Sequence, residues 1–271
     1  MQYEPIKKVL GGFFGKSPFL RKLLYILLDL LLLRTWHVRK AIRKAGRGLP
    51  SDAMVLDAGS GLGQYSWRMS SRYRGWKIKG VDINREEIAG CTDFFTKTGR
   101  SGRVHFETCD LVAFSDKALY DFILTVDVME HIEEDKVVFR NFFNALKEGG
   151  ILLISTPSDI GGSDVRQEHD DSFIDEHVRD GYGKEEITKK LADAGFSKVN
   201  VRYTYGKAGH ISWILSMKYP VRLLNISYLF FIILPFYYLA VYPVSFFLNV
   251  IDQNIEHKTG TGLLVIAEKA R

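Results

Sequence analysis

A glycine-rich turn between a short apolar strand and a helix constrains this chain more than any other feature. Residues 55–64 read VLDAGSGLGQ, with glycines at positions 59, 61 and 63. Glycine has no Cβ, so the backbone can turn tightly and lie directly against a ligand. The run from Gln64 to Ser71 predicts a helix, whose N-terminus favours polar or anionic groups. The segment therefore predicts a nucleotide-type cradle within an α/β fold, with a ligand-free tight turn as the alternative.

The spacing of the glycines narrows the choice of ligand. Dinucleotide-binding loops read G-x-G-x-x-G, but here Gln64 stands where the third glycine would be, and Gly63 lies one position earlier. Asp57 precedes the first glycine by two residues. The pattern resembles the D/E-x-G-x-G-x-G motif of class I S-adenosylmethionine (SAM)-dependent methyltransferases. An NAD-dependent oxidoreductase is the alternative enzyme class, which the glycine spacing disfavours.

Strand-like segments downstream fit the same family. The first, residues 77–82, ends in Asp82, 19 residues after Gly63 and close to the offset of about 20 expected for a ribose-binding carboxylate. Further strands are expected at 104–107, 120–127, 149–155, 197–205 and 262–268, with helices at 134–146 and 184–194. The resemblance implies a doubly wound, Rossmann-like α/β fold with a seven-stranded sheet whose last strand is antiparallel.

The resemblance also assigns a cofactor and its binding residues. It implies SAM as the cofactor and S-adenosylhomocysteine as the product. An acid after the second strand would bind the ribose, and one after the third strand would bind the adenine amino group. The expected cofactor-binding residues are Asp57, Gly59, Gly61, Gly63, Asp82, Ile83, Asp110, Leu111 and Asp127.

The charge of the chain is unevenly distributed. The net charge is +5, yet the first 50 residues carry eleven Lys/Arg and two Asp/Glu, while the rest carries twenty-six and thirty. Because the basic segment is also very apolar, it favours an anionic membrane over nucleic acid as partner. Two cysteines, Cys91 and Cys109, indicate no disulfide framework and fit a reducing compartment.

Two apolar segments lie outside the expected sheet. Residues 19–33 are too short to span a bilayer comfortably and predict an interfacial helix, or else a helix that caps the core. Residues 223–251 carry no charge, but they lie between the sixth and seventh strands, which must stay on one side of a membrane. Pro235 and Pro243 are expected to break this run into short pieces. We expect an interfacial hairpin or a lid, with a core or dimer-interface helix pair as the alternative.

These observations predict three regions and a location. Residues 1–50 form a basic, apolar helical segment, residues 51–205 with 260–271 form the SAM-binding domain, and residues 206–259 form a hydrophobic helical insertion. The expected location is the cytoplasmic face of a membrane, with peripheral or monotopic attachment. The expected partners are that membrane and a lipophilic small-molecule acceptor, with no nucleic acid; a homo-oligomer would form through the insertion. The acceptor would be phenolic, quinol-like, a pigment precursor or a lipid, methylated on oxygen. A catalytically silent protein of the same fold is the alternative from another class.

The acceptor side offers two candidate bases. Asp127-x-x-Glu130-His131 resembles the E-x-x-E-H segment of ubiquinone-biosynthesis O-methyltransferases, where the acids and the histidine lie at the acceptor and can bind a divalent metal. Aspartate replaces the first glutamate here, so no metal is assigned, and a metal site, an acceptor contact and a helix cap all stay open. His131 and His177 are the expected catalytic residues, because imidazole can remove a phenol proton near neutral pH. Arg179 and Tyr182 would orient an acceptor or tie down their loop.

Overall fold

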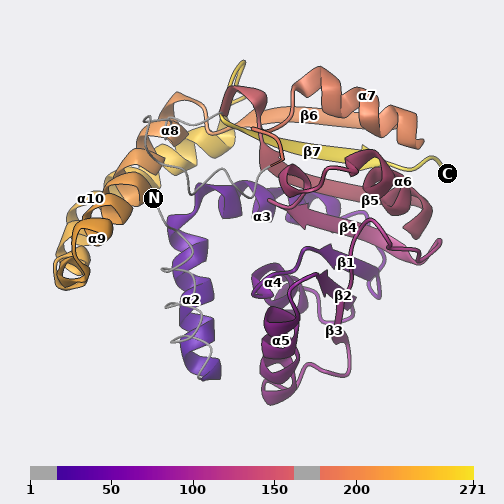
Figure 1. Ribbon diagram of the computed structural model, residues 1–271, viewed down its shortest axis with the longest axis horizontal. Helices are drawn as coiled ribbons and strands as arrows, with labels where there is room; N and C mark the ends of the chain where they lie inside the picture. The colour runs from indigo at the N-terminus through magenta and orange to yellow at the C-terminus, as the bar shows by residue number, and fades with distance from the viewer. Residues whose placement is uncertain (1–16, 162–177) are drawn as a thin grey trace.

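A seven-stranded sheet forms the centre of the protein. The computed structural model describes residues 17–161 and 178–271 (Figure 1). The strands are β1 (Met54–Ala58), β2 (Lys77–Asp82), β3 (Val104–Thr108), β4 (Tyr120–Val126), β5 (Leu146–Pro157), β6 (Lys198–Thr204) and β7 (Gly262–Glu268). Their order is β3-β2-β1-β4-β5-β7-β6, and β7 is antiparallel to both of its neighbours. The doubly wound fold with an antiparallel last strand is therefore confirmed, and all seven expected strands are present.

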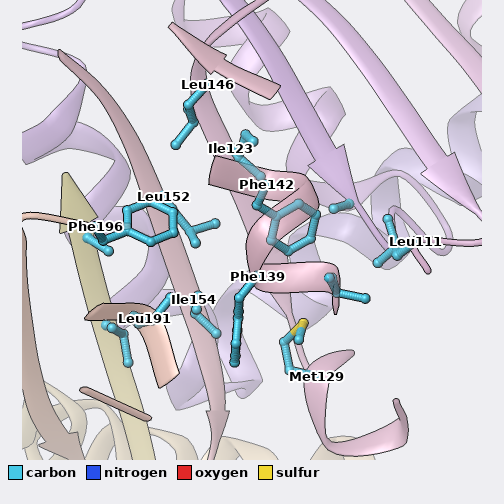
Figure 2. Close-up of a cluster of buried hydrophobic side chains, with 14 of the residues drawn as sticks. Leu111, Ile123, Met129, Phe139, Phe142, Leu146, Leu152, Ile154, Leu191 and Phe196 are labelled. Carbon is cyan, nitrogen blue, oxygen red and sulfur yellow. The ribbon is translucent and has the colours of Figure 1, made fainter. Parts of the chain in front are cut away.

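Helices cover both faces of the sheet. Apolar side chains of α3 (Leu33–Ala45), α4 (Gln64–Arg72) and α5 (Arg85–Lys97) pack on one face. Those of α6 (Asp135–Ala145) and α7 (Lys184–Ala194) pack on the other, where Phe139 and Phe142 of α6 meet Leu152 and Ile154 of β5 (Figure 2). Central strands buried on both faces read as nearly continuous apolar runs, which is why β1, β4 and β5 could be located from sequence.

Local signals set the helix ends near the sheet. Asn84 caps α5, since its side-chain oxygen accepts hydrogen bonds from the amides of Glu86 at 3.0 Å and Glu87 at 3.3 Å. Gly195 ends α7 with a φ of 113°, a left-handed value that glycine takes without strain. Asn84 thus ends the loop at the carboxyl edge after β2, whereas Gly195 ends α7 at the opposite edge, just before β6.

The N-terminal apolar segment is two helices rather than one. Ser17 caps α2 (Pro18–Leu31), and the backbone leaves the helical region at Leu32 before α3 begins. Val38, Ala41 and Ile42 of α3 are buried against the sheet, so this part of the segment belongs to the core. The outer face of α2 stays exposed.

A helical hairpin connects β6 to β7, as the fold prediction expected. It contains α8 (Lys207–Trp213), the π-helix η3 (Ile214–Lys218), α9 (Tyr219–Ile226), the 3₁₀-helix η4 (Tyr228–Ile232) and α10 (Leu234–Asn254). In Figure 1 this hairpin extends away from the sheet, at the left of the view.

The expectation that Pro243 breaks the apolar run is wrong. Pro235 lies in the first turn of α10, where the missing N–H has no helical partner to lose, but Pro243 lies inside a continuous helix of 21 residues. The hydroxyls of Tyr237 and Tyr238 donate to carbonyls of the π-helix, each at 2.7 Å, and hold α10 on the other arm of the hairpin. The helix therefore continues through Pro243 while these contacts hold its first half against the other arm.

Candidate functional site

The glycine loop between β1 and α4 has a backbone that other residues would strain. Gly59, Gly61 and Gly63 have φ values of 75°, 47° and 75°. A Cβ on Gly59 would lie 2.1 Å from a methyl of Val128, and one on Gly63 would lie 3.0 Å from the sulfur of Cys91. The loop is tied to the end of β2, because the Gly59 amide donates to the Val81 carbonyl at 2.8 Å. Close packing below therefore leaves the loop's other surface to approach a ligand.

Asp57 lies beneath this loop rather than on its open side. Its carboxylate is 2% exposed and accepts a hydrogen bond from the Ser66 hydroxyl at 2.6 Å. Burial raises the pKa of Asp57 to about 7. The contact ties the end of β1 to the first turns of α4, so this acid shapes the loop from below.

Asp82 stands at the carboxyl end of β2, beside the loop. Its carboxylate accepts hydrogen bonds from the amides of Gly61 and Asn84, each at 2.9 Å. A carboxylate has about four acceptor positions, so two amide bonds leave capacity for a ribose diol. Ile83 follows with a largely exposed side chain, which makes it available as an apolar wall next to Asp82.

The two candidates after β3 differ in their surroundings. Asp110 is exposed, and its carboxylate accepts a hydrogen bond from the Val112 amide at 2.9 Å. The Leu111 side chain is buried in the same apolar cluster as Phe142 and Met129 (Figure 2). Asp110 is thus accessible to a ligand through its side chain, whereas Leu111 supports the loop from within the core.

Asp127 follows β4 with a φ of 51° and pairs with a residue from the N-terminal segment. Its amide donates to the Ser155 carbonyl at 2.8 Å, and its carboxylate forms an ion pair with Arg34 of α3. The backbone amide of Arg34 in turn donates to the Tyr205 hydroxyl at 2.8 Å, just after β6. Sequence reasoning missed Arg34 and Tyr205, because neither belongs to a motif; the density of basic residues near Arg34 is the sole sequence signal.

Glu130 and His131 point to different environments. Both belong to the 3₁₀-helix η1 (Met129–His131), but Glu130 is buried and accepts a hydrogen bond from the Thr156 hydroxyl at 3.1 Å, whereas His131 is exposed. Burial raises the pKa of Glu130. Within residues 17–161 and 178–271, no group of three or more His, Cys, Asp or Glu side chains could hold a metal ion. Asp127, Glu130 and His131 therefore do not form a three-ligand metal site in the described structure.

The second candidate base, His177, lies outside the described residues. The segment that follows it is firmly anchored: the Val178 amide donates to the Glu130 carbonyl at 3.1 Å, and the Tyr182 hydroxyl donates to Asp135 at 2.8 Å. Arg179 also pairs with Asp135. Arg179 and Tyr182 thus tie this segment to η1 and α6. Of the two roles expected for them, orienting an acceptor or anchoring their loop, these contacts fit the second.

Two cavities differ in their relation to the glycine loop. One of about 440 Å³ is lined by Lys77, Lys79, Arg103 and His105, near the start of β2 and β3, at the edge opposite the loop. The other, of about 200 Å³, lies at the carboxyl edge and is lined by Ile160 after β5, Tyr205 after β6, residues of α8 and the segment before β7. Through Tyr205 and Arg34 the second cavity adjoins Asp127, so it is the better candidate for an acceptor.

A sequence profile described as a methyltransferase domain matches residues 34–201. The chain belongs to this methyltransferase family. The match covers the glycine loop, Asp82, Asp110 and Asp127, so it coincides with the cluster built above. It also decides against the oxidoreductase alternative.

Curated relatives of this methyltransferase carry names for two kinds of methylation, one on nitrogen and one on oxygen. Phosphoethanolamine N-methyltransferase 1 of Triticum aestivum is 31% identical over 160 residues, 56% of this chain and 30% of the relative. Ubiquinone biosynthesis O-methyltransferase of Idiomarina loihiensis is 28% identical over 102 residues, 38% of this chain and 41% of the relative. The chain spans less than half the length of these relatives.

Solved structures give the same fold. Haemonchus contortus phosphoethanolamine N-methyltransferase 2, in complex with phosphomonomethylethanolamine and S-adenosylhomocysteine, matches with a TM-score of 0.62 and 20% identity, covering 87% of this chain and 53% of that one. The same enzyme has been solved with SAM. Membership of the methyltransferase family, together with the D-x-G-x-G-x-G loop at residues 57–63, makes SAM the cofactor of this protein.

The residues at the carboxyl edge fit that cofactor. The glycine loop offers close backbone approach, the partly exposed Asp82 offers ribose acceptors, and Asp110 offers an accessible carboxylate at the next strand. SAM supplies a methyl group already activated by its sulfonium, so the protein's part is to position the reactants and exclude water. The Arg34–Asp127 pair stands where β4 ends, between the loop and the second cavity.

Proposed function

We propose that this methyltransferase docks on a membrane through its helical hairpin and methylates a lipophilic acceptor that enters from the bilayer. The single observation that carries the proposal is the exposed apolar tip of the hairpin. Ile226, Leu229, Ile232, Phe236 and Leu239 are each 70–78% exposed. Soluble proteins rarely expose contiguous apolar patches of this kind without a partner.

Basic residues stand where a headgroup layer would meet the hairpin. Arg222 and Lys218 lie one and two helical turns before Ile226, roughly 6 and 12 Å back along the helix axis. Such residues gain about 1 kcal/mol each near an anionic lipid surface. An apolar tip below a basic belt matches an anionic bilayer better than it matches another apolar protein surface.

The topology restricts how deeply the hairpin inserts. By length and composition alone α10 could cross a membrane, and it is the one such helix within the described ranges. Both ends of the insertion, however, join strands of one sheet, β6 and β7, which pair along their whole length. The hairpin must return to the side it left, so the proposal is insertion into one leaflet from the cytoplasmic face.

The hairpin is positioned to deliver an acceptor to the site. Its first helix, α8, contributes Lys207 and His210 to the cavity of about 200 Å³ at the carboxyl edge. In this proposal an amphiphile enters from the bilayer along the hairpin and reaches the cavity at its base. A hydroxyl on a phenolic, quinol-like or lipid acceptor is the proposed methylated group.

The relatives favour a second candidate acceptor. Both the wheat and the Haemonchus proteins are phosphoethanolamine N-methyltransferases by name, which suggests an amine next to a phosphate as the methylated group. On a membrane, the corresponding molecule is a lipid with such a headgroup. The two candidates share the bilayer as their source and differ in the atom methylated.

Co-sedimentation with vesicles tests the docking surface. We expect the full chain to pellet with vesicles of phosphatidylcholine and phosphatidylglycerol, and the variant Leu229→Ser/Ile232→Ser/Phe236→Ser to remain in the supernatant. A control variant, Leu119→Ser/Val137→Ser, changes exposed apolar residues near β4 and on α6 and should pellet like the wild type. All three should bind S-adenosylhomocysteine, which shows that they are folded. A wild type that stays in the supernatant, or a hairpin variant that pellets equally well, overturns the docking proposal.

A further inference from the structure

Helix α2 lies against the glycine loop through one of its faces. Leu24 and Tyr25 are buried on that face, together with the cation Arg21, which is 6% exposed. Asp29, near the end of the helix, accepts a hydrogen bond from Gln64 at 2.9 Å, and Gln64 is the first residue of α4. The helix therefore contacts both the loop and the helix that the loop begins.

The Arg21 guanidinium donates hydrogen bonds to the cofactor loop and to α5, which packs beside it. Its guanidinium donates to the Leu62 carbonyl at 2.8 Å and to the Gly90 carbonyl at 2.6 Å, and contacts the Cys91 sulfur at 3.0 Å. The Cys91 thiol donates to the Gly61 carbonyl at 3.2 Å. Arg21 thus reaches two successive loop residues, one directly and one through Cys91.

A second donor from α2 converges on the same carbonyl. The Tyr25 hydroxyl donates to the Leu62 oxygen and accepts a hydrogen bond from the Arg21 guanidinium at 2.9 Å. Within the described residues, the hydrogen-bond acceptors around the Arg21 guanidinium are carbonyls, a thiol and this hydroxyl, none of them a carboxylate, and the guanidinium lies 5.0 Å from the centre of the Phe94 ring. Burying a cation costs free energy that such neutral partners offset only when their geometry is held well. A methionine at this position would pack without that cost, so packing alone does not account for an arginine.

The orientation of the Leu62 carbonyl matters for the cofactor. Leu62 stands between Gly61 and Gly63, both at positive φ, and glycines resist rotation of the neighbouring peptide planes less than any other residue. The Leu62 carbonyl shares its peptide plane with the Gly63 amide, which donates to the Ser60 carbonyl at 2.8 Å. Holding the Leu62 oxygen therefore fixes the plane in the middle of the loop and the start of α4.

We infer that Arg21 is a positioning residue for the cofactor loop, and that α2 thereby sets the affinity for SAM and S-adenosylhomocysteine. The inference rests on the cofactor and not on the membrane proposal. A fixed loop binds without first losing conformational entropy, so releasing it lowers affinity even when the ligand contacts are unchanged.

Calorimetry with S-adenosylhomocysteine on the full chain tests this. Arg21→Met removes every donor while keeping the volume, and we expect a dissociation constant at least tenfold higher. Arg21→Lys keeps the charge but lacks the fork that reaches both Leu62 and Gly90, so an intermediate loss is expected. Lys97→Met, at an exposed cation on α5, is the matched control and should bind like the wild type.

Amide hydrogen exchange distinguishes a local effect on the cofactor loop from a general loss of stability. In Arg21→Met the amides of Gly61 and Gly63 should exchange faster than in the wild type, while those of β4 and β5 remain protected. Wild-type affinity and exchange in Arg21→Met overturn the inference. If Arg21→Met does not fold, Tyr25→Phe removes one bond to the same carbonyl; unchanged affinity and exchange in that variant also overturn it. Vesicle binding by Arg21→Met should match the wild type, which separates this inference from the docking proposal.

Discussion

The imidazole of His37 lies 2.9 Å from the carboxylate of Asp252, although 215 residues separate them in the chain. Both side chains are almost fully buried. Asp252 also accepts hydrogen bonds from the amides of Gly209 at 3.0 Å and Tyr205 at 3.2 Å. One carboxylate near the end of α10 therefore joins the hairpin to α3 and to the strand end beside the site.

Replacing Asp252 by asparagine should destabilise the protein strongly. The asparagine side chain has one acceptor oxygen, and its NH₂ group would face a donor. At least one of the three donors, the His37 ring and the backbone amides of Tyr205 and Gly209, therefore loses its partner. Leaving a buried donor without its charged acceptor in this way costs about 3 kcal/mol. Urea unfolding at pH 7.5 measures the change; a loss below about 0.5 kcal/mol would mean that the cluster does not hold the hairpin.

The same pair predicts a pH dependence of stability. Burial lowers the pKa of the His37 imidazole below its usual 6.5. The positive charges of Arg202 and His257 lower this pKa further, and together these effects outweigh Asp252, which raises it. The unfolded chain then binds the proton more readily, so stability is present above pH 6.5 and is lost as the pH falls below it. Between pH 7.5 and 5.5 the wild type should lose about 1 kcal/mol more than His37→Gln, which still donates to Asp252 but does not titrate. Equal slopes in the two proteins would contradict a buried neutral His37.

The Asp252 carboxyl titrates in a different window. Burial alone would raise its pKa, but the hydrogen bond from His37 and the Gly209 amide outweigh that effect and lower it. Its contribution to stability is therefore lost only as the pH falls below about 4, the ordinary range of an aspartate. The two groups can be separated experimentally by the pH at which stability declines.

Most of the fold could be predicted because its signals are local. The apolar strands, the glycine loop and the Gly195 stop each lie within a few residues of one another. Proline spacing gives the wrong expectation at Pro243, because α10 is also held by the other arm of the hairpin, where Leu215 and Ser216 offer carbonyls to Tyr237 and Tyr238. Contacts between distant segments are not encoded in proline spacing.

Adding a methyl group to Gly59 should impair folding more than cofactor chemistry. The new Cβ would meet Val128 at 2.1 Å and occupy a φ of 75°, which costs a non-glycine residue roughly 1–2 kcal/mol before any clash. Gly59→Ala should therefore lower the melting temperature by several degrees, and Val128→Ala should restore part of the loss in the double variant. Additive effects of the two substitutions, measured by calorimetric melting, would show that the loop does not pack on Val128.

Asp82 is predicted to be the most sensitive acid of the cofactor site. Asp82→Ala removes both the ribose acceptors and the bond that holds the Gly61 amide, so S-adenosylhomocysteine should bind at least tenfold more weakly. Asp93→Ala, an exposed acid on α5 paired with Lys97, is the control and should leave the affinity unchanged. Titration calorimetry compares them, and equal affinities would place the ribose elsewhere.

The candidate site was predictable where the motif is contiguous and not where segments meet. Asp57 and Asp82 lie at the carboxyl ends of β1 and β2, and Asp110 follows β3, so their places at one sheet edge come from topology. Arg34, at the start of α3, reaches Asp127 only because α3 packs on the sheet, and Arg21 reaches Leu62 only because the backbone turns between α2 and α3 at Leu32. No spacing rule connects these residues, so their roles emerge from the three-dimensional arrangement alone.

Transfer of labelled methyl from SAM to a lipid extract tests the central claim most directly. We expect the full chain to place label in the organic phase, and Asp82→Ala to reduce that label at least tenfold at limiting SAM. The hairpin variant Leu229→Ser/Ile232→Ser/Phe236→Ser should lose organic-phase product while still binding S-adenosylhomocysteine. Label that appears solely in water-soluble phosphoethanolamine, and equally with the wild type and the hairpin variant, would contradict a membrane-derived acceptor.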